Sequence, residues 1–190
     1  KIAQPPLCKE AMGGTIVALP SNFEELSIEK DFLKIVNNRT SHRVYSKESI
    51  SLLELSYLLW TTQGVKSVRG NNYATLRTVP SGGARHGFET YLFVNNVESL
   101  KNGKYHYLPL THELEYLDNE TTDEVLRDAL SGQTWGVSSN VVFFWSIVPY
   151  RCEWRYSAYS HRIALVDIGY VSQNLYLACE SIGLGTCAIG

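Results

Sequence analysis

The chain has 190 residues, of which 44% are hydrophobic and 19% are charged, and its formal charge at pH 7 is −2. This size and composition predict one folded domain, with neither a membrane-spanning apolar run nor a disordered tract. Acidic and basic residues are interspersed without a basic stripe, which disfavours a nucleic-acid partner. The four cysteines, Cys8, Cys152, Cys179 and Cys187, have no regular spacing. This spacing and the lack of a recognisable signal peptide favour reduced thiols in a cytoplasmic protein.

The N-terminal part of the chain predicts one helix. Residues 1–26 are expected to form a loosely ordered, proline-containing segment. A helix is then expected to open at Ser27, with Glu29 and Lys30 in its first turn. Its apolar residues follow helical spacing and are Ile28, Phe32, Ile35 and Val36.

A second helix is expected after Ser51, which can form a capping box with Glu54, and Gly64 is placed to end it. Its apolar face consists of Leu52, Leu55, Leu58 and Leu59. The segment Pro80–Gly87 predicts a loop or a single helical turn, and its glycines allow the backbone to approach a ligand. It leads into a predicted strand from Glu89 to Val94.

The second half of the chain predicts more strands and a further helix. Residues 104–108 and 113–117 are expected to form a hairpin, and residues 121–131 a capped helix. The continuous apolar run Val141–Val148 is typical of a strand buried on both faces, so we expect it at the centre of the sheet.

A long helix is predicted from Ser160 to Ser181, ending at Gly183, and it is apolar on nearly all sides. Such a helix must be buried, either within this domain or against a second subunit. Residues 186–189 are expected to start one more strand. No repeat or linker divides the chain, so we expect an α+β fold in which helices flank a mixed sheet, in a single domain over residues 1–190.

Only one short segment suggests ligand chemistry from its residues alone. Arg39 and Arg43 place two guanidiniums on either side of Ser41, and these groups can converge on one phosphate, although an exposed helix end gives the same pattern. The run Gly183–Ala188 has a dinucleotide-binding spacing but follows a helix instead of a strand, so we interpret it as a helix end and tight turn. The histidines have no metal-binding spacing, and no serine-nucleophile motif occurs.

Six motifs occur in order between about Asn37 and Gly190. They are Arg39-x-Ser41-x-Arg43-x-Tyr45, Leu55-x-x-Leu58-Leu59-Trp60, Pro80-Ser81-Gly82-Gly83, Gly103-x-Tyr105-x-Tyr107, Gly169-x-x-x-Gln173-Asn174-Leu175 and Gly183-Leu184-Gly185. Together they resemble the nitroreductase-like, FMN-dependent flavoenzymes, most closely the SagB-type dehydrogenase branch that includes azoline oxidases of peptide-toxin biosynthesis. The resemblance implies a nitroreductase-like fold, with a mixed, mostly antiparallel sheet flanked by helices and the long helix buried at a dimer interface.

The resemblance also implies an FMN site that two subunits of a homodimer share. The positions that match the family's cofactor-binding positions are Arg39, Ser41, Arg43, Pro80, Ser81, Gly82, Gln173, Asn174, Ile189 and Gly190. The first three would hold the flavin phosphate, and the next three would pack near the flavin ring, usually from the other subunit. Gln173 and Asn174 would lie on the long helix near the flavin, and the last two would approach flavin N5 through their backbone.

Two features depart from the family pattern. Family members continue beyond the position of Gly190 with a further strand and a basic residue, so the C-terminal part of the family domain is expected to be absent here. The azoline oxidases carry a Lys-Tyr pair before the long helix, where this chain has Arg155 and Tyr156. A guanidinium cannot act as a base, so these candidate catalytic residues suit anion or acceptor binding and reduction. Alternatively, both are surface groups in a loop.

The resemblance therefore implies an oxidoreductase that transfers a hydride through flavin N5, from NAD(P)H to a nitroaromatic or quinone-like acceptor. One alternative is a SagB-type dehydrogenase that oxidises azoline rings in a modified peptide. Another is a non-catalytic flavin-binding protein. The expected partners are accordingly a second copy of the chain and a small-molecule or peptide substrate.

Overall fold

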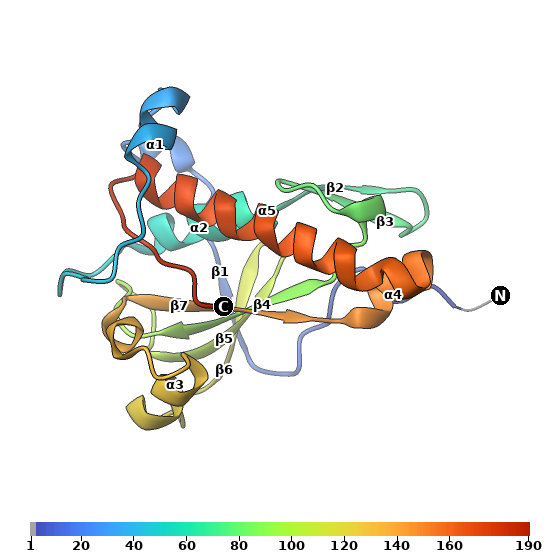
Figure 1. Ribbon diagram of the computed structural model, residues 1–190. Helices are drawn as coiled ribbons and strands as arrows, with labels where there is room; N and C mark the ends of the chain where they lie inside the picture. The colour runs from blue at the N-terminus through green and yellow to red at the C-terminus, as the bar shows by residue number, and fades with distance from the viewer. Residues whose placement is uncertain (1–2) are drawn as a thin grey trace.

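The computed structural model describes residues 3–190, and its centre is a five-stranded antiparallel sheet (Figure 1). In spatial order the strands are β1 (Thr15–Ala18), β6 (Glu113–Asp118), β5 (Gly103–Leu108), β4 (Phe88–Val94) and β7 (Val141–Ile147). An isolated parallel bridge joins Ile50 and Val97. A separate hairpin consists of β2 (Val65–Arg69) and β3 (Ala74–Arg77). The predicted α+β fold with a mixed, mostly antiparallel sheet is confirmed.

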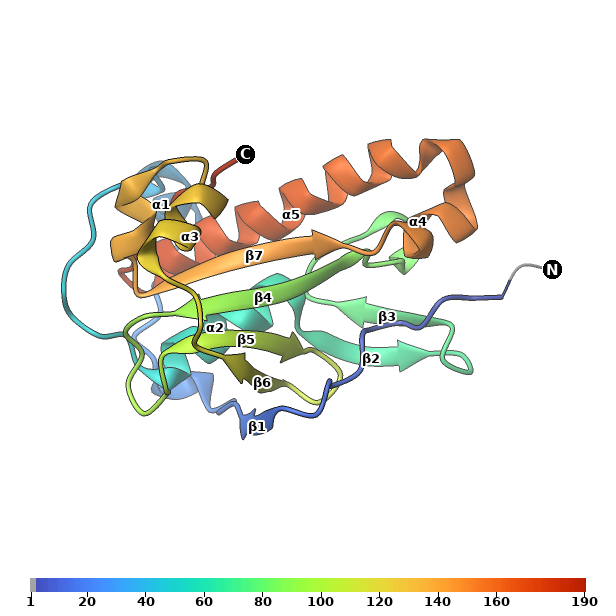
Figure 2. The same ribbon diagram turned by 90° about the horizontal axis from the view of Figure 1, so that it is seen from below.

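Helices α2 (Leu52–Gln63) and α5 (Ser160–Ser181) cover one face of the sheet, as Figures 1 and 2 show. Helix α2 has the predicted capping box, in which Ser51 and Glu54 each accept a hydrogen bond from the backbone of the other. The side chains that α2 and the strands bury together include Leu55, Leu59, Leu92, Tyr105 and Leu114, all at most 1% exposed. These leucines and tyrosines form the main core between the two layers.

Helix α5 has the predicted bounds, and Gly183 follows it with φ of +75°. One face of α5 is buried through Ala164, Val171, Leu175 and Ala178. On another face, Leu165 is 75% exposed and Val166 is 45% exposed. A single chain therefore covers only part of the apolar surface of this helix.

The opposite face of the sheet carries α3 (Asp123–Ala129) and the short 3-10 helix η3 (Thr134–Ser138), where Leu126 and Leu130 pack on Val142 and Phe144. The expected central position of the run 141–148 is wrong, because β7 is an edge strand and β5 is in the middle. The run is apolar because other elements cover both faces of β7, even though one edge of this strand pairs with no other strand in the described chain. Phe143 and Trp145 pack on the side of α2 and α5.

Two other predicted elements differ from the structure. Helix α1 (Phe32–Asn38) begins at its cap Asp31 instead of at Ser27. The preceding residues are held in a non-helical conformation because the Glu29 carboxylate accepts the backbone N–H groups of Lys30 and Asp31, while the Glu29 backbone bonds to the end of α5. The strand expected at 186–189 is also absent, since this part of the described chain is irregular and pairs with no strand.

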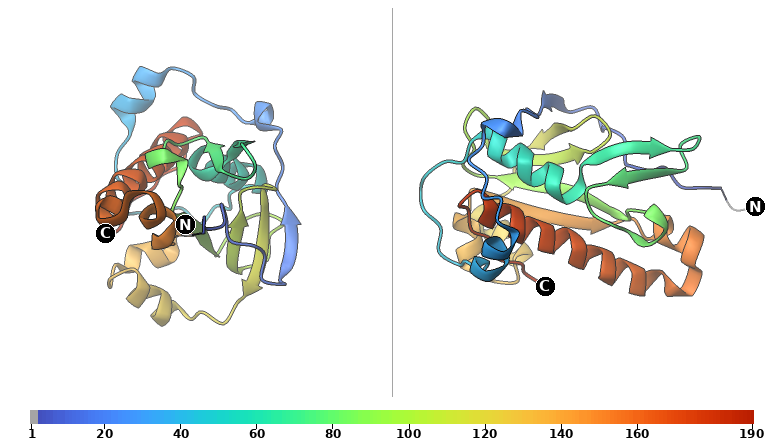
Figure 3. Two further views of the ribbon diagram at one scale, coloured as in Figure 1. Left: turned by 90° about the vertical axis from the view of Figure 1, so that its right-hand side faces the viewer. Right: turned by 90° about the horizontal axis from the view of Figure 1, so that it is seen from above.

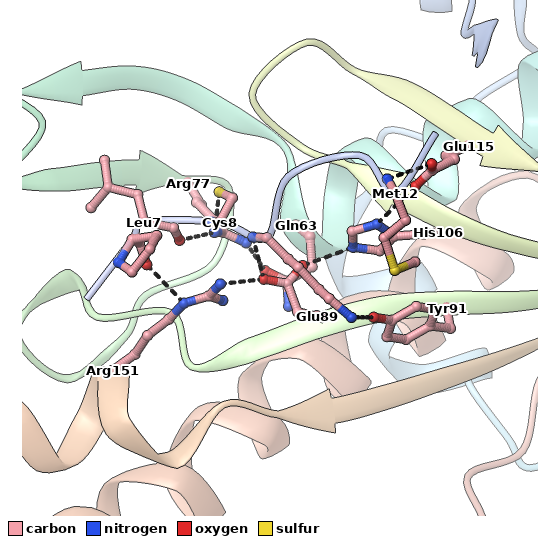
Figure 4. A network of polar contacts seen from close by, with 12 residues as sticks. Leu7, Cys8, Met12, Gln63, Arg77, Glu89, Tyr91, His106, Glu115 and Arg151 are labelled. Atoms are coloured by element: carbon pink, nitrogen blue, oxygen red, sulfur yellow. Dashed lines mark hydrogen bonds and ion pairs between the residues drawn. The ribbon is translucent and has the colours of Figure 1, made fainter. Parts of the chain in front are cut away.

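The first 26 residues were expected to be loosely ordered, but residues 3–26 include β1 and the 3-10 helix η1 (Phe23–Glu25). The backbone N–H of Lys9 bonds to Glu89, and the N–H groups of Met12 and Gly14 bond to Glu115 (Figure 4). These carboxylates come from β4 and β6 and provide acceptors that sequence periodicity does not reveal. The segment is thus tied across the face of the sheet that lies opposite α5.

The same carboxylates belong to a buried polar network in Figure 4. Arg151 Nη2 lies 2.5 Å and His106 Nε2 lies 3.0 Å from the Glu89 carboxylate, and all three residues are at most 4% exposed. Burial alone would raise the pKa of Glu89, but the hydrogen bond from His106 and the charge of Arg151 lower it to about 2. Glu89 is therefore ionised and depends on its partners in the folded protein.

Candidate functional site

A cavity of about 740 Å³ lies along the free edge of β7. Its walls include His42, residues 44–46, β7, the C-terminal half of α5, residues 183–189 and the region of α3 and η3. The aromatic side chains that line it are Tyr45, Trp135, Phe143, Phe144, Trp145 and Tyr176. This volume is within the usual range for a small-molecule or cofactor pocket, and the apolar lining is typical of one.

Arg39, Ser41 and Arg43 do not line the cavity themselves, but the structure brings them to two of its aromatic residues. The guanidinium of Arg39 lies 5.3 Å from the ring centroid of Tyr176, and that of Arg43 lies 5.9 Å from the ring centroid of Trp135. Ser41 Oγ lies 3.1 Å from the Tyr176 hydroxyl. Neither guanidinium has a carboxylate partner among residues 3–190. Both can therefore offer their N–H groups to an anion at the cavity.

The C-terminal residues form a second wall through their backbone. Gly185 packs so closely that a Cβ atom there would lie 2.8 Å from the His42 side chain, and the backbone N–H of Ala188 donates to the Tyr176 hydroxyl over 2.8 Å. Ile189 lines the cavity, whereas Gly190 does not. The glycine at 185 thus allows the two irregular segments to close around one end of the cavity.

His42 and Glu180 line the cavity together with hydroxyl, thiol and indole groups. Burial raises the pKa of Tyr45 to about 12, with a contribution from the nearby Cys187, so its hydroxyl keeps its proton and donates to the His42 carbonyl. Burial likewise raises the pKa of Cys179 to about 12. The buried Nε1 of Trp145 has no partner in the described protein. The cavity therefore suits a ligand that brings its own reactive group.

Pro80, Ser81 and Gly82 lie against a different part of α5. Gly82 approaches so closely that a Cβ atom there would lie 2.5 Å from Ile163, and Ser81 bonds to Asp167. By contrast, Arg39 stacks on Tyr176 nearer the C-terminal end of the helix. Ile163 and Tyr176 are about 20 Å apart along the helix axis, at 1.5 Å per residue. The two groups of predicted residues therefore do not converge on one site within a single chain.

Arg155 and Tyr156 lie at the end of helix α4 (Pro149–Tyr156), not in a loop. A Cβ atom on Gly83 would lie 2.7 Å from Arg155 Nε and 2.7 Å from the Tyr156 hydroxyl, so the pair contacts the segment that follows Gly82. Arg155 also donates to the Tyr73 hydroxyl over 2.5 Å. The hydrogen bonds to Tyr156 and Tyr73 raise the pKa of Arg155, which remains a fixed cation.

Gln173 and Asn174 line neither the cavity nor the region of Gly82 in this chain. Gln173 is exposed, and Asn174 Nδ2 donates to the Thr61 carbonyl of α2 over 2.8 Å. Sequence reasoning did not identify Trp135, Tyr176 or Asp167, which contact the predicted residues. Of these three, only Asp167 could have been noticed in the sequence, because it is an acidic residue in an otherwise apolar part of α5.

Figures 1 and 3 show how these regions are distributed. The hairpin of β2 and β3 and helix α4 lie near the N-terminal end of α5, whereas α1 and the segment after it lie near the other end. No group of three or more potential metal-ligating side chains occurs within residues 3–190. In the same part of the chain, no helix is both long and apolar enough to cross a membrane.

Residues 36–190 match the Nitroreductase family. A relative from Methanocaldococcus jannaschii, named "Putative nitroreductase MJ1384", is 32% identical over 94% of this chain and 86% of its own length. The Trifolitoxin-processing protein TfxB of Rhizobium leguminosarum bv. trifolii is 27% identical over 88% of this chain. The match covers 51% of that protein, so the chain spans about half of its length.

Solved structures share the fold. One is the crystal structure of a "putative nitroreductase" from Anabaena variabilis, with a TM-score of 0.70 at 24% identity. The match covers 90% of this chain and 35% of that one. The Escherichia coli Microcin synthetase McbBCD complex with truncated pro-MccB17 bound contains a chain with a TM-score of 0.57 at 26% identity, covering 79% of this chain and 59% of that one. This protein belongs to the Nitroreductase family, within which it resembles the SagB-type branch.

Proposed function

We propose that the protein is an FMN-dependent oxidoreductase that uses NAD(P)H to reduce a nitroaromatic or quinone-like acceptor. The observation that carries this proposal is the cavity of about 740 Å³, beside which two guanidiniums without carboxylate partners in the described chain lie over the lining rings of Tyr176 and Trp135. A planar ring needs apolar walls and a phosphate needs cations, and the cavity offers the first while the two guanidiniums next to it offer the second.

The donor set fits FMN at both ends of the cofactor. Arg39, Ser41 and Arg43 would hold the phosphate, because their guanidiniums and hydroxyl lie on the cavity's own aromatic residues. The buried Trp145 Nε1 has no partner in residues 3–190, and it would donate to a polar edge of the ring system. Leaving such a donor unpaired costs free energy, which a bound acceptor would recover.

Bound FMN would supply the two-electron chemistry, and the protein would supply position and environment. The aromatic walls would exclude water, which strengthens the electrostatic interactions made inside the cavity. Tyr45 keeps its proton because burial raises its pKa to about 12, and it donates that proton to the His42 carbonyl, so towards a ligand its hydroxyl oxygen can only accept a hydrogen bond. Arg155 stays cationic beside Tyr156 and would bind an anionic or electron-rich substrate group.

The second part of the proposal is a homodimer with two shared sites. The cavity and the Pro80–Gly83 segment contact opposite parts of α5, while Leu165 and Val166 are exposed on that helix. A two-fold pairing of these helices would bring the segment of one chain to the cavity of the other. Because the exposed apolar face needs cover, we expect an interface that buries more than about 2000 Å² in total.

Subunit mixing tests the shared site directly. Arg43→Ala would disable the cavity half and Gly82→Ala, whose added methyl would lie 2.5 Å from Ile163, would disable the segment half. Each variant alone is expected to lose most NAD(P)H-dependent reduction of a nitroaromatic. In a dimer that contains one chain of each variant, the intact cavity of one chain meets the intact segment of the other, so one of the two sites is intact. About half of the dimers reassembled from an equal mixture are of this kind, so the mixture should recover about one quarter of wild-type activity. No recovery in confirmed mixed dimers would contradict sharing.

Oxidation of azoline rings in a modified peptide is the second candidate function. It is favoured by the similarity to a trifolitoxin-processing protein and to a chain of a complex with truncated pro-MccB17 bound. Against it stands Arg155, which cannot act as a base at the position of the azoline oxidases' lysine. Assays with NADH, NADPH and an azoline-containing peptide separate the two candidates. Turnover of the peptide but not of NAD(P)H would reject the reductase proposal.

A further inference from the structure

The loop from Pro80 to Gly87, called the glycine loop below, has a strained backbone. The φ angles of Gly83, Ala84 and His86 are +57°, +53° and +44°. Residues with a Cβ atom rarely adopt positive φ, and such strain persists only where surrounding contacts over-determine the conformation. The contacts that fix this loop therefore identify the residues on which its shape depends.

Asp167 of α5 makes the contacts that tie the start of the glycine loop. Its Oδ2 accepts a hydrogen bond from Ser81 Oγ over 2.6 Å, and its Oδ1 accepts one from the Gly82 backbone N–H over 3.1 Å. Ser81 Oγ in turn accepts the backbone N–H of His86 over 2.9 Å. One side chain thus links the helix, the first residues of the loop and the strained residue near its end.

Asp167 is only 3% exposed and has no ion pair with a cation among residues 3–190. A buried acidic side chain without a cationic partner is costly, and its two loop hydrogen bonds offset part of this cost. An apolar side chain would suit the buried face of α5 better, as Ala164 and Val171 on either side of it illustrate. Packing alone therefore does not account for an aspartate here.

We propose that Asp167 is a positioning residue of the cofactor site, which holds the glycine loop in the shape in which its backbone meets the flavin ring in the cavity of a second subunit. This inference rests on the proposed function. Since Arg155 and Tyr156 contact the loop at Gly83, the same hydrogen bonds also affect the position of these two candidate catalytic residues. Asp167 acts through the loop and does not itself touch the cofactor.

Hydrogen exchange of the flavin-free protein tests the positioning role separately from cofactor binding. Asp167→Ala is expected to speed amide exchange in residues 82–86 by about tenfold or more relative to wild type, because it removes two hydrogen bonds to one carboxyl group. Ser81→Ala should give the same local effect. The double variant should exchange faster than either single variant but by less than the two effects combined, because both substitutions remove the same hydrogen bond between Ser81 and Asp167.

Ser56→Ala is the matched control, since Ser56 is also a buried hydrogen-bonding residue but lies on α2 and contacts Pro20 and His112. It should leave exchange in the glycine loop unchanged. Unchanged loop exchange in Asp167→Ala would overturn the proposal. So would a uniform increase across the sheet and helices, which would show a general loss of stability, or additive effects in the double variant.

Flavin titration then tests the link to the site. Asp167→Ala is expected to weaken FMN binding by about tenfold and to alter the visible circular dichroism of the bound ring. Asp167→Asn keeps the shape and one acceptor, so its effect should be intermediate. Wild-type FMN affinity and dichroism in Asp167→Ala would overturn the link to the cofactor. A wild-type protein that binds no FMN would instead refute the proposed function, while the exchange result would still report on the loop.

Discussion

Removal of the Arg43 guanidinium tests the phosphate site with little effect on folding. Arg43 is exposed, its neighbour in the structure is the Trp135 ring at 5.9 Å, and it has no ion pair among the described residues. Loss of an exposed cation–π contact costs at most about 1 kcal/mol of stability. Loss of one charged hydrogen-bond partner of a phosphate costs about 1.5 to 3 kcal/mol, which weakens FMN binding by about 10 to 150-fold.

The assay is a titration of FMN and of riboflavin into flavin-free wild type, Arg43→Ala and Arg39→Ala. Riboflavin lacks the phosphate, so both substitutions should weaken FMN binding and leave riboflavin affinity nearly unchanged. Lys47→Ala is the control, because Lys47 is an exposed cation on the same segment but, unlike Arg39 and Arg43, is not placed over an aromatic ring of the cavity among the described residues. Wild-type FMN affinity in Arg43→Ala, or an equal loss in Lys47→Ala, would refute the assignment of the phosphate site.

Three further predictions concern the buried groups and the candidate catalytic pair. Arg151→Met should lower the free energy of unfolding in urea by about 3 to 5 kcal/mol, because Glu89 loses its buried partner, and a loss below about 1 kcal/mol would contradict this. Burial and the charge of Arg77 lower the pKa of His86 to about 3. The unfolded chain therefore binds the extra proton, and stability should fall as pH drops from about 6.5 towards 3, by up to about 1.4 kcal/mol per unit. His86→Asn should flatten this slope in urea unfolding at several pH values, and an unchanged slope would show that other groups dominate. Tyr156→Phe should lower nitroaromatic reduction without restoring azoline oxidation, whereas appreciable azoline oxidation by the wild type would show that Arg155 does not prevent it.

The sequence predicted best those elements whose signals are local. The capping box of Ser51 and Glu54 and the bounds of α5 are confirmed, because capping and helical periodicity depend on neighbouring residues. The start of α1 was misplaced because Glu29 bonds to the end of α5, a contact between distant segments. The apolar run of β7 was read as a central strand, since coverage of both faces gives the same pattern at an edge.

The candidate site was predictable only in part for the same reason. The roles of Arg39, Ser41 and Arg43 came from a family resemblance, and the structure places all three on aromatic residues of the cavity. Trp135 and Tyr176 could not be assigned from sequence, because they reach the cavity from elements distant along the chain. Likewise, nothing in the sequence pairs Asp167 with Ser81, which lies 86 positions away.

We propose above that the cavity along β7 binds FMN between two copies of the chain. The most direct test is the visible absorption spectrum of the purified protein, measured together with the flavin-to-chain ratio and the mass in solution. We expect the absorption bands of oxidised FMN, about one FMN per chain and the mass of a dimer. A protein that takes up no FMN at micromolar concentration, or a monomer that binds it fully, would refute a shared FMN site.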